Sequence, residues 1–124
     1  MKKQANRFTN LLVAAAVTIG AGATAAEEVV VIATARVQNG SERAFIERAN
    51  RLVDETRREN GVVSYTYHQS VDTPSEFVFV EHYASQTAFE AHLHGPVLAE
   101  FFGKAKPLFA PGFPVIKQYR EMTP

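Results

Sequence analysis

A single acidic residue interrupts a strongly apolar stretch in the middle of the chain. Glu81 lies in the run Phe-Val-Phe-Val-Glu-His-Tyr over residues 77–83, where an ionised carboxylate is costly to bury without hydrogen bonds. One interpretation is a carboxyl group of raised pKa that accepts or donates a proton in an apolar pocket. The other is a residue at a strand end that reaches solvent or pairs with an arginine. The sequence leaves both open.

His92 is the second candidate for proton transfer. It follows Ala88 and Phe89 by four and three residues, so in a helix it shares their face and points inward toward a sheet. An inward histidine can be a base or a satisfied core residue, whereas His94 is expected at an exposed helix end. Residues i and i+2 diverge by about 200° on a helix. His92-Leu93-His94 therefore predicts no metal site, since no third ligand is placed by the sequence.

Two strand-like runs, Val62–Ser70 and Glu76–Ala84, flank a segment with the composition of a hairpin loop. Pairing of the two loop-proximal ends would set three pairs opposite one another: Tyr65 with Glu81, Tyr67 with Phe79, and Val63 with Tyr83. One face of the hairpin would then carry Glu81 among aromatic side chains. A tyrosine opposite Glu81 could donate a hydrogen bond to its carboxyl group.

Aromatic residues of this face and of the last helical segment are the candidate substrate-binding residues. They are Tyr65, Tyr67, Phe79, Tyr83 and Phe102. Phe102 and its apolar neighbours are most simply core residues, but they would also line any cavity left between sheet and helix. The chain has no phosphate-binding loop, no Gly-x-Gly-x-x-Gly motif, no serine elbow and no Cys. Nucleotide cofactors, thiolate metal sites and a cysteine nucleophile are therefore not expected.

The elements that must position these residues follow the order β-α-β-β-α-β. The expected strands are Glu28–Val37, Val62–Ser70, Glu76–Ala84 and Phe113–Arg120. The first expected helix runs from the cap Ser41 to Asn60-Gly61. The second helical region begins at the cap Ser85, continues through Leu93, is interrupted at Gly95-Pro96 and ends at Pro107. This order predicts an α+β, ferredoxin-like fold, with an antiparallel sheet and the helices on one face. The uncovered sheet face favours a homodimer.

The first 26 residues have a different composition from the rest. Lys2, Lys3 and Arg7 precede an apolar run over 11–19 and small residues over 20–26, which predicts a signal peptide at 1–26 and a single domain at 27–124. The apolar run is too short to span a bilayer, which takes about 20 residues. All 13 acidic residues lie after it, so the remaining chain is mildly acidic, which argues against nucleic-acid binding. We expect an exported protein, periplasmic or secreted, that is free of the membrane after cleavage.

With this element order, the segments 39–41, 56–65, 79–85 and 88–93 resemble the antibiotic biosynthesis monooxygenase family, over nearly all of residues 28–121. The family pattern of a glycine, a strand tyrosine, a Glu-x-aromatic and a helix histidine corresponds to Gly61, Tyr65, Glu81, Tyr83 and His92. The resemblance implies a dimeric α/β barrel. It also implies oxidation of a quinol or related electron-rich aromatic by O2, without flavin, haem or metal.

On this hypothesis His92 or Glu81 deprotonates the substrate, while Tyr65 and Tyr83 donate hydrogen bonds to the oxyanion. The similar haem-degrading proteins need an asparagine, a tryptophan and a histidine where this chain has Ala33, Tyr83 and Phe102, so haem degradation is disfavoured. Because one fold hosts many functions, two alternatives stay open. They are a non-catalytic module for small-molecule binding or stress response, and an isomerase or decarboxylase.

Overall fold

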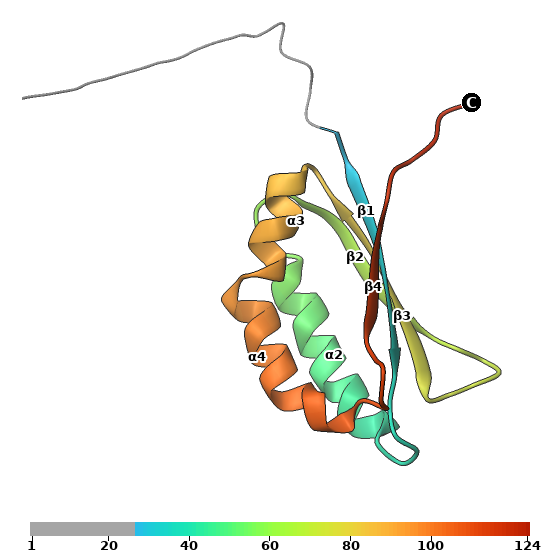
Figure 1. Ribbon diagram of the computed structural model, residues 1–124. Helices are drawn as coiled ribbons and strands as arrows, with labels where there is room; N and C mark the ends of the chain where they lie inside the picture. The colour runs from blue at the N-terminus through green and yellow to red at the C-terminus, as the bar shows by residue number, and fades with distance from the viewer. Residues whose placement is uncertain (1–26) are drawn as a thin grey trace, which may run out of the picture.

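The computed structural model describes residues 27–124, so the predicted signal peptide lies outside the described residues. The elements are β1 (Val29–Arg36), α2 (Glu42–Thr56), β2 (Val62–Gln69), β3 (Glu76–Tyr83), α3 (Gln86–Leu93), α4 (Pro96–Ala105), the 3-10 turn η3 (Lys106–Leu108) and β4 (Val115–Tyr119) (Figure 1). In this part of the chain no helix is long and apolar enough to cross a membrane.

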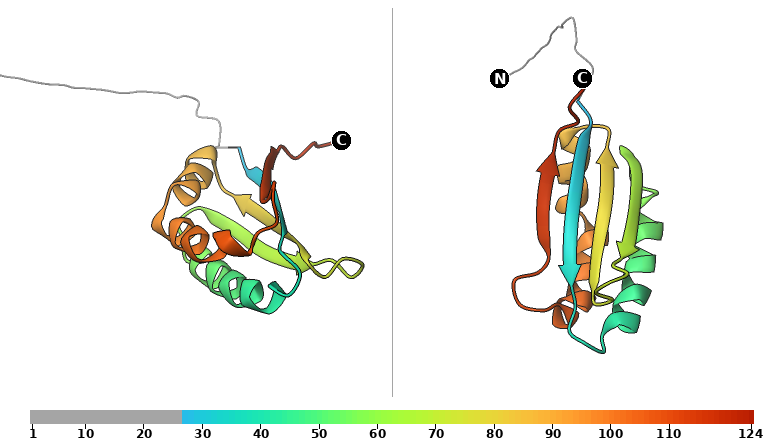
Figure 2. Two further views of the ribbon diagram at one scale, coloured as in Figure 1. Left: turned by 60° about the horizontal axis from the view of Figure 1, so that its bottom comes forward. Right: turned by 90° about the vertical axis from the view of Figure 1, so that its right-hand side faces the viewer.

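The four strands form one antiparallel sheet in the order β2-β3-β1-β4. All three helices lie against one face of this sheet, and the described chain leaves the other face uncovered (Figure 2). The predicted ferredoxin-like architecture is therefore confirmed. Ser85 begins α3 as predicted, since its hydroxyl accepts from the Ala88 amide at 3.1 Å.

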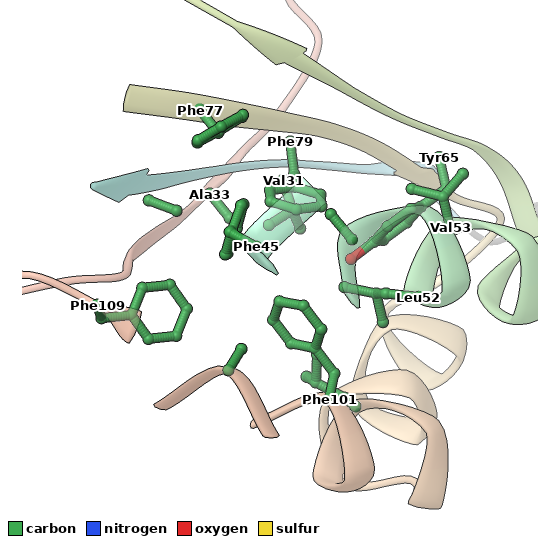
Figure 3. Close-up of a cluster of buried hydrophobic side chains, with 14 of the residues drawn as sticks. Val31, Ala33, Phe45, Leu52, Val53, Tyr65, Phe77, Phe79, Phe101 and Phe109 are labelled. Atoms are coloured by element: carbon green, nitrogen blue, oxygen red, sulfur yellow. The ribbon is translucent and has the colours of Figure 1, made fainter. Parts of the chain in front are cut away.

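The core lies between the sheet and the helices. Along β1 and β3 every second side chain is buried and the others are half-buried, as expected when one sheet face packs against helices. Phe45 of α2 is fully buried, and its ring lies near those of Phe77, Phe79, Phe101 and Phe109 at centroid distances of 4.8 to 6.3 Å (Figure 3). These aromatic contacts pack the helices against the sheet.

The predicted hairpin register holds over most of its length and is wrong at one end. Tyr65 pairs with Glu81 and Tyr67 with Phe79, as predicted, but Tyr83 pairs with Val62 rather than with Val63. A bulge between Val62 and Ser64 accounts for the difference, because it places one extra residue in β2.

The observed strands and first helix are shorter than predicted, and the difference is largest for the first helix and the last strand. The first helix ends at Thr56 instead of reaching Asn60-Gly61, because tight i to i+3 bonds close it: the amides of Arg58 and Glu59 donate to the carbonyls of Glu55 and Thr56 at 3.1 and 2.9 Å. The last strand covers Val115–Tyr119 rather than 113–120. The side chain of the predicted cap Ser41 makes no capping hydrogen bond.

Gly61 is expected to be far less tolerant of alanine than Gly40. Both have positive φ, +82° and +91°, but a Cβ on Gly61 would lie 2.5 Å from the Ala88 Cβ, whereas one on Gly40 would meet nothing within 4 Å. Gly61→Ala should lower the free energy of unfolding by about 2 kcal/mol more than Gly40→Ala, because overpacking adds to backbone strain. Urea denaturation followed by circular dichroism measures both, and equal losses would contradict the close approach of this turn to α3.

Candidate active site

A cavity lies between the helix-facing side of the sheet and the helix layer. The space free of protein atoms at this site is about 420 Å³ when the open solvent at its mouth is included. Its lining combines three polar groups with a mainly apolar wall: Tyr65, Glu81 and His92, and then Ala33, Leu52, Phe89, Leu93, Leu98, Phe101, Phe102, Phe109, Pro114 and Ile116. A concave, mostly apolar site with a few convergent polar groups is typical of small-molecule sites.

The three polar groups form one end of this cavity, because Tyr65 pairs with Glu81 across the sheet and the Tyr65 and His92 ring centroids are 5.4 Å apart. Glu81 itself is buried, with 4% of its surface exposed. This burial excludes the interpretation of a residue that reaches solvent, and its partner is a tyrosine rather than an arginine. The Tyr83 hydroxyl donates to Glu81 Oε2 at 2.5 Å, so the donor is two residues along the same strand and not the opposite Tyr65. Burial raises the pKa of Glu81 to about 7, and this hydrogen bond opposes the rise.

His92 enters the same cavity from α3 and is 3% exposed. Its ring lies against the rings of Tyr65 and Tyr83, at centroid distances of 5.4 and 5.7 Å. Its Nδ1 lies 2.8 Å from Oε1 of Glu59, in the turn between α2 and β2. The sequence predicted an inward His92 but did not find Glu59, since a glutamate in a polar turn carries no distinguishing spacing signal.

Tyr65 is the third polar group, placed on β2 directly opposite Glu81. Its side chain points from the sheet toward Leu52 in the helix layer (Figure 3). Burial, and then the nearby carboxyl groups of Glu81 and Glu59, hold the pKa of Tyr65 well above its usual range. Tyr65 therefore keeps its proton at neutral pH and can act as a hydrogen-bond donor.

The other predicted site residues occupy different places. Phe102 lines the cavity, whereas Tyr83 is not among the lining residues and its hydroxyl donates a hydrogen bond to the carboxyl group of Glu81. Tyr67 and Phe79 stack on each other at a centroid distance of 5.3 Å, outside the lining, and the Tyr67 hydroxyl donates to Asn50 at 2.6 Å. The structure thus brings Glu81, His92, Tyr65 and Phe102 together.

No group of three or more His, Asp or Glu side chains in residues 27–124 is placed to hold a metal ion. Pro114 and Ile116, which were not among the predicted site residues, also line the cavity, and Ile116 belongs to β4. The sequence pattern of β4 does not indicate this position, because β4 reaches the cavity only through its pairing with β1 in the sheet.

Comparisons with known proteins find one relative in sequence and several in structure. The chain is 23% identical over 104 residues to the uncharacterised protein sll1783 of Synechocystis, covering 83% of this chain and 71% of that protein. A structure from Nitrosomonas europaea, named after the antibiotic biosynthesis monooxygenases, superposes with a TM-score of 0.74 at 23% identity, over 82% of this chain and 96% of that one. Protein SO0527 from Shewanella oneidensis superposes with a TM-score of 0.71 at 26% identity, over 77% and 91%.

The family assignment follows from a match over most of the domain. The family model "Antibiotic biosynthesis monooxygenase" matches residues 28–104, more than half of the chain, and the chain belongs to this family. The matched segment contains Gly61, Tyr65, Glu81, Tyr83 and His92, so the resemblance expected from these residues is confirmed at the level of the family.

Proposed function

We propose that this protein is a cofactor-independent monooxygenase that oxidises a quinol or related electron-rich aromatic with O2. The observation that carries the proposal is the convergence of Glu81, His92 and Tyr65 at one end of a cavity with otherwise apolar walls. An aromatic body fits such walls, and a phenolic hydroxyl fits the polar end. Among the described lining residues there is no Lys or Arg, which favours a substrate without carboxylate or phosphate groups.

The proposed reaction balances without an external reductant. A quinol that carries a ring C–H and one O2 become a hydroxyquinone and one water, so one oxygen atom enters the ring and the other leaves as water. The substrate supplies all four electrons, two from the quinol and two from the ring C–H bond. The protein's task is to remove the hydroxyl proton and to stabilise the anion, which is the species that reduces O2.

Each polar group has a role in this scheme. Glu81 or His92 takes the proton from the substrate hydroxyl, since both are buried and border the cavity. Tyr65 donates a hydrogen bond to the resulting oxyanion, because its raised pKa keeps it protonated. Tyr83 acts on Glu81, whose ionised form its hydrogen bond favours.

Oxygen uptake by the metal-stripped protein tests this function. A panel of quinols and hydroxylated aromatics is assayed in an oxygen electrode, with the autoxidation rate of each compound subtracted. The proposal predicts saturable uptake that a chelator leaves unchanged. Stoichiometric retention of a ligand without uptake would replace it with a binding module, and conversion under strict anaerobiosis would replace it with an isomerase or decarboxylase.

A homodimer through the uncovered sheet face belongs to the same proposal. Val30, Ile32, Val78 and Val80 lie on this face and are half-buried in the described chain, and a second copy would remove their apolar surface from water. Val80→Glu is therefore expected to give monomers by analytical ultracentrifugation. Val71→Glu, in a loop where Val71 is 94% exposed, is the matched control and should leave the dimer intact. A monomeric wild-type protein would contradict the proposal.

Export to the periplasm or outside the cell, with removal of residues 1–26, is the remaining part of the proposal. The basic, apolar and small-residue segments at the amino terminus support it. Amino-terminal sequencing of the protein recovered from the periplasmic fraction should begin at Glu27 or one residue before it. Recovery of the full chain in the cytoplasm would contradict export.

A further inference from the structure

Glu59 makes a contact with His92 that the proposed roles of the cavity residues do not use. The two residues are far apart in the chain, yet Glu59 Oε1 and His92 Nδ1 lie 2.8 Å apart. The His92 side chain is 2% exposed and that of Glu59 is 23% exposed. The contact therefore links a buried imidazole to a carboxyl group at the protein surface.

This contact determines which imidazole nitrogen carries the proton. An ionised carboxylate can only accept hydrogen bonds, so a neutral His92 must donate from Nδ1–H to Glu59. Nε2 then has no proton and can accept one. Since His92 lines the cavity and its Nδ1 is engaged by Glu59, Nε2 is the nitrogen left for a ligand.

Both partners are held in place by their surroundings. The rings of Tyr65 and Tyr83 restrict the imidazole plane. The backbone of Glu59 is fixed within its turn, because its amide donates to Thr56 O at 2.9 Å and its carbonyl accepts from the Val62 amide at 3.4 Å. The carboxylate is thus positioned before any ligand binds, as preorganisation of a base requires.

We infer that Glu59 is a positioning residue that holds neutral His92 in the Nδ1–H tautomer and presents Nε2 to the cavity as a proton acceptor. The effect on turnover rests on the proposed function, whereas the effect on the tautomer does not. When Nε2 takes a proton, the carboxylate of Glu59 stabilises the imidazolium through the same hydrogen bond. Glu59 therefore acts through His92, and it is not among the residues that line the cavity.

Nuclear magnetic resonance of the full chain with 15N-labelled histidine tests the tautomer directly. At about pH 8, where an ordinary imidazole is neutral, the wild-type spectrum should show a protonated Nδ1 and an unprotonated Nε2 for His92, assigned by its loss in His92→Gln. Glu59→Gln should give a mixture of tautomers, because an amide can either donate or accept. Glu90→Gln, an exposed carboxyl on α3, should leave the His92 signals unchanged.

Oxygen uptake provides the second measurement. Glu59→Gln should lower kcat at least about tenfold while Glu90→Gln keeps the wild-type value, since an orienting carboxylate acts on the base during turnover. A wild-type His92 protonated on Nε2, or an unchanged tautomer in Glu59→Gln, would overturn the positioning role. A tautomer change in a protein that consumes no oxygen with any quinol would support the positioning role and overturn the proposed function instead.

Discussion

Replacing Glu81 and His92 together by glutamine is expected to slow O2-dependent turnover by about 10²–10⁴-fold, the usual contribution of a general base. Both groups border the cavity and are buried, at 4% and 3% exposure. Glutamine fills much of the same space but accepts no proton at neutral pH. The double variant thus removes proton transfer while it preserves the apolar walls. Oxygen uptake with the best substrate of the quinol panel measures the loss.

The matched control makes the same two chemical changes on the exposed side of α3. Glu90 and His94 are both exposed, so Glu90→Gln with His94→Gln should keep the wild-type rate. Thermal unfolding of both double variants confirms that each is folded under assay conditions. Turnover that survives the Glu81 and His92 changes would show that neither group is the base.

The second large expected effect is the contribution of Glu81 to the pH dependence of the free energy of unfolding. The pKa of Glu81 is about 7 in the folded protein and 4.5 for an ordinary glutamate, with desolvation as the main cause. At a pH between these two pKa values, Glu81 is protonated in the folded protein and ionised in the unfolded chain. Raising the pH through this window therefore favours unfolding, and the protein loses about 3 kcal/mol from this group by the time the pH exceeds 7.

The Glu81→Gln variant has no group to ionise at this position. Its free energy of unfolding, relative to that of the wild type, should rise by about 3 kcal/mol between about pH 4 and pH 8. Urea denaturation at a series of pH values measures the difference, in which the titration of other groups cancels. Glu90→Gln should show no such change. A difference between wild type and Glu81→Gln that is constant with pH would contradict a protonated, buried carboxyl group.

Sequence reasoning predicted those features that depend on local pattern. The length of the loop between the two strands predicted the hairpin register, and the helical spacing of Phe89 and His92 predicted that the histidine points inward. Both patterns are informative because an element that buries one face must place its apolar side chains together on that face. Glu81 could be singled out because a carboxyl group is rare in an apolar run.

The features that sequence reasoning missed depend on tertiary contacts. The β2 bulge that pairs Val62 with Tyr83 has no mark in the sequence beyond the glycine before it. Glu59 contacts His92 only because α3 packs against the turn after α2. Gly61 in that turn permits the close approach to Ala88 of α3. Glu81 and Tyr83 are i and i+2 on one strand, where their side chains share a face, but the opposite Tyr65 was the predicted donor.

The fate of the two oxygen atoms of O2 distinguishes a monooxygenase from an oxidase that only reduces O2 to hydrogen peroxide. Turnover of the best quinol of the panel under 18O2, followed by mass spectrometry of the product, measures how many labelled atoms enter the ring. We expect one 18O atom in each hydroxyquinone and the other in water, with incorporation lost in the Glu81 and His92 double variant. A product that contains no 18O, with hydrogen peroxide released instead, would contradict the monooxygenase assignment.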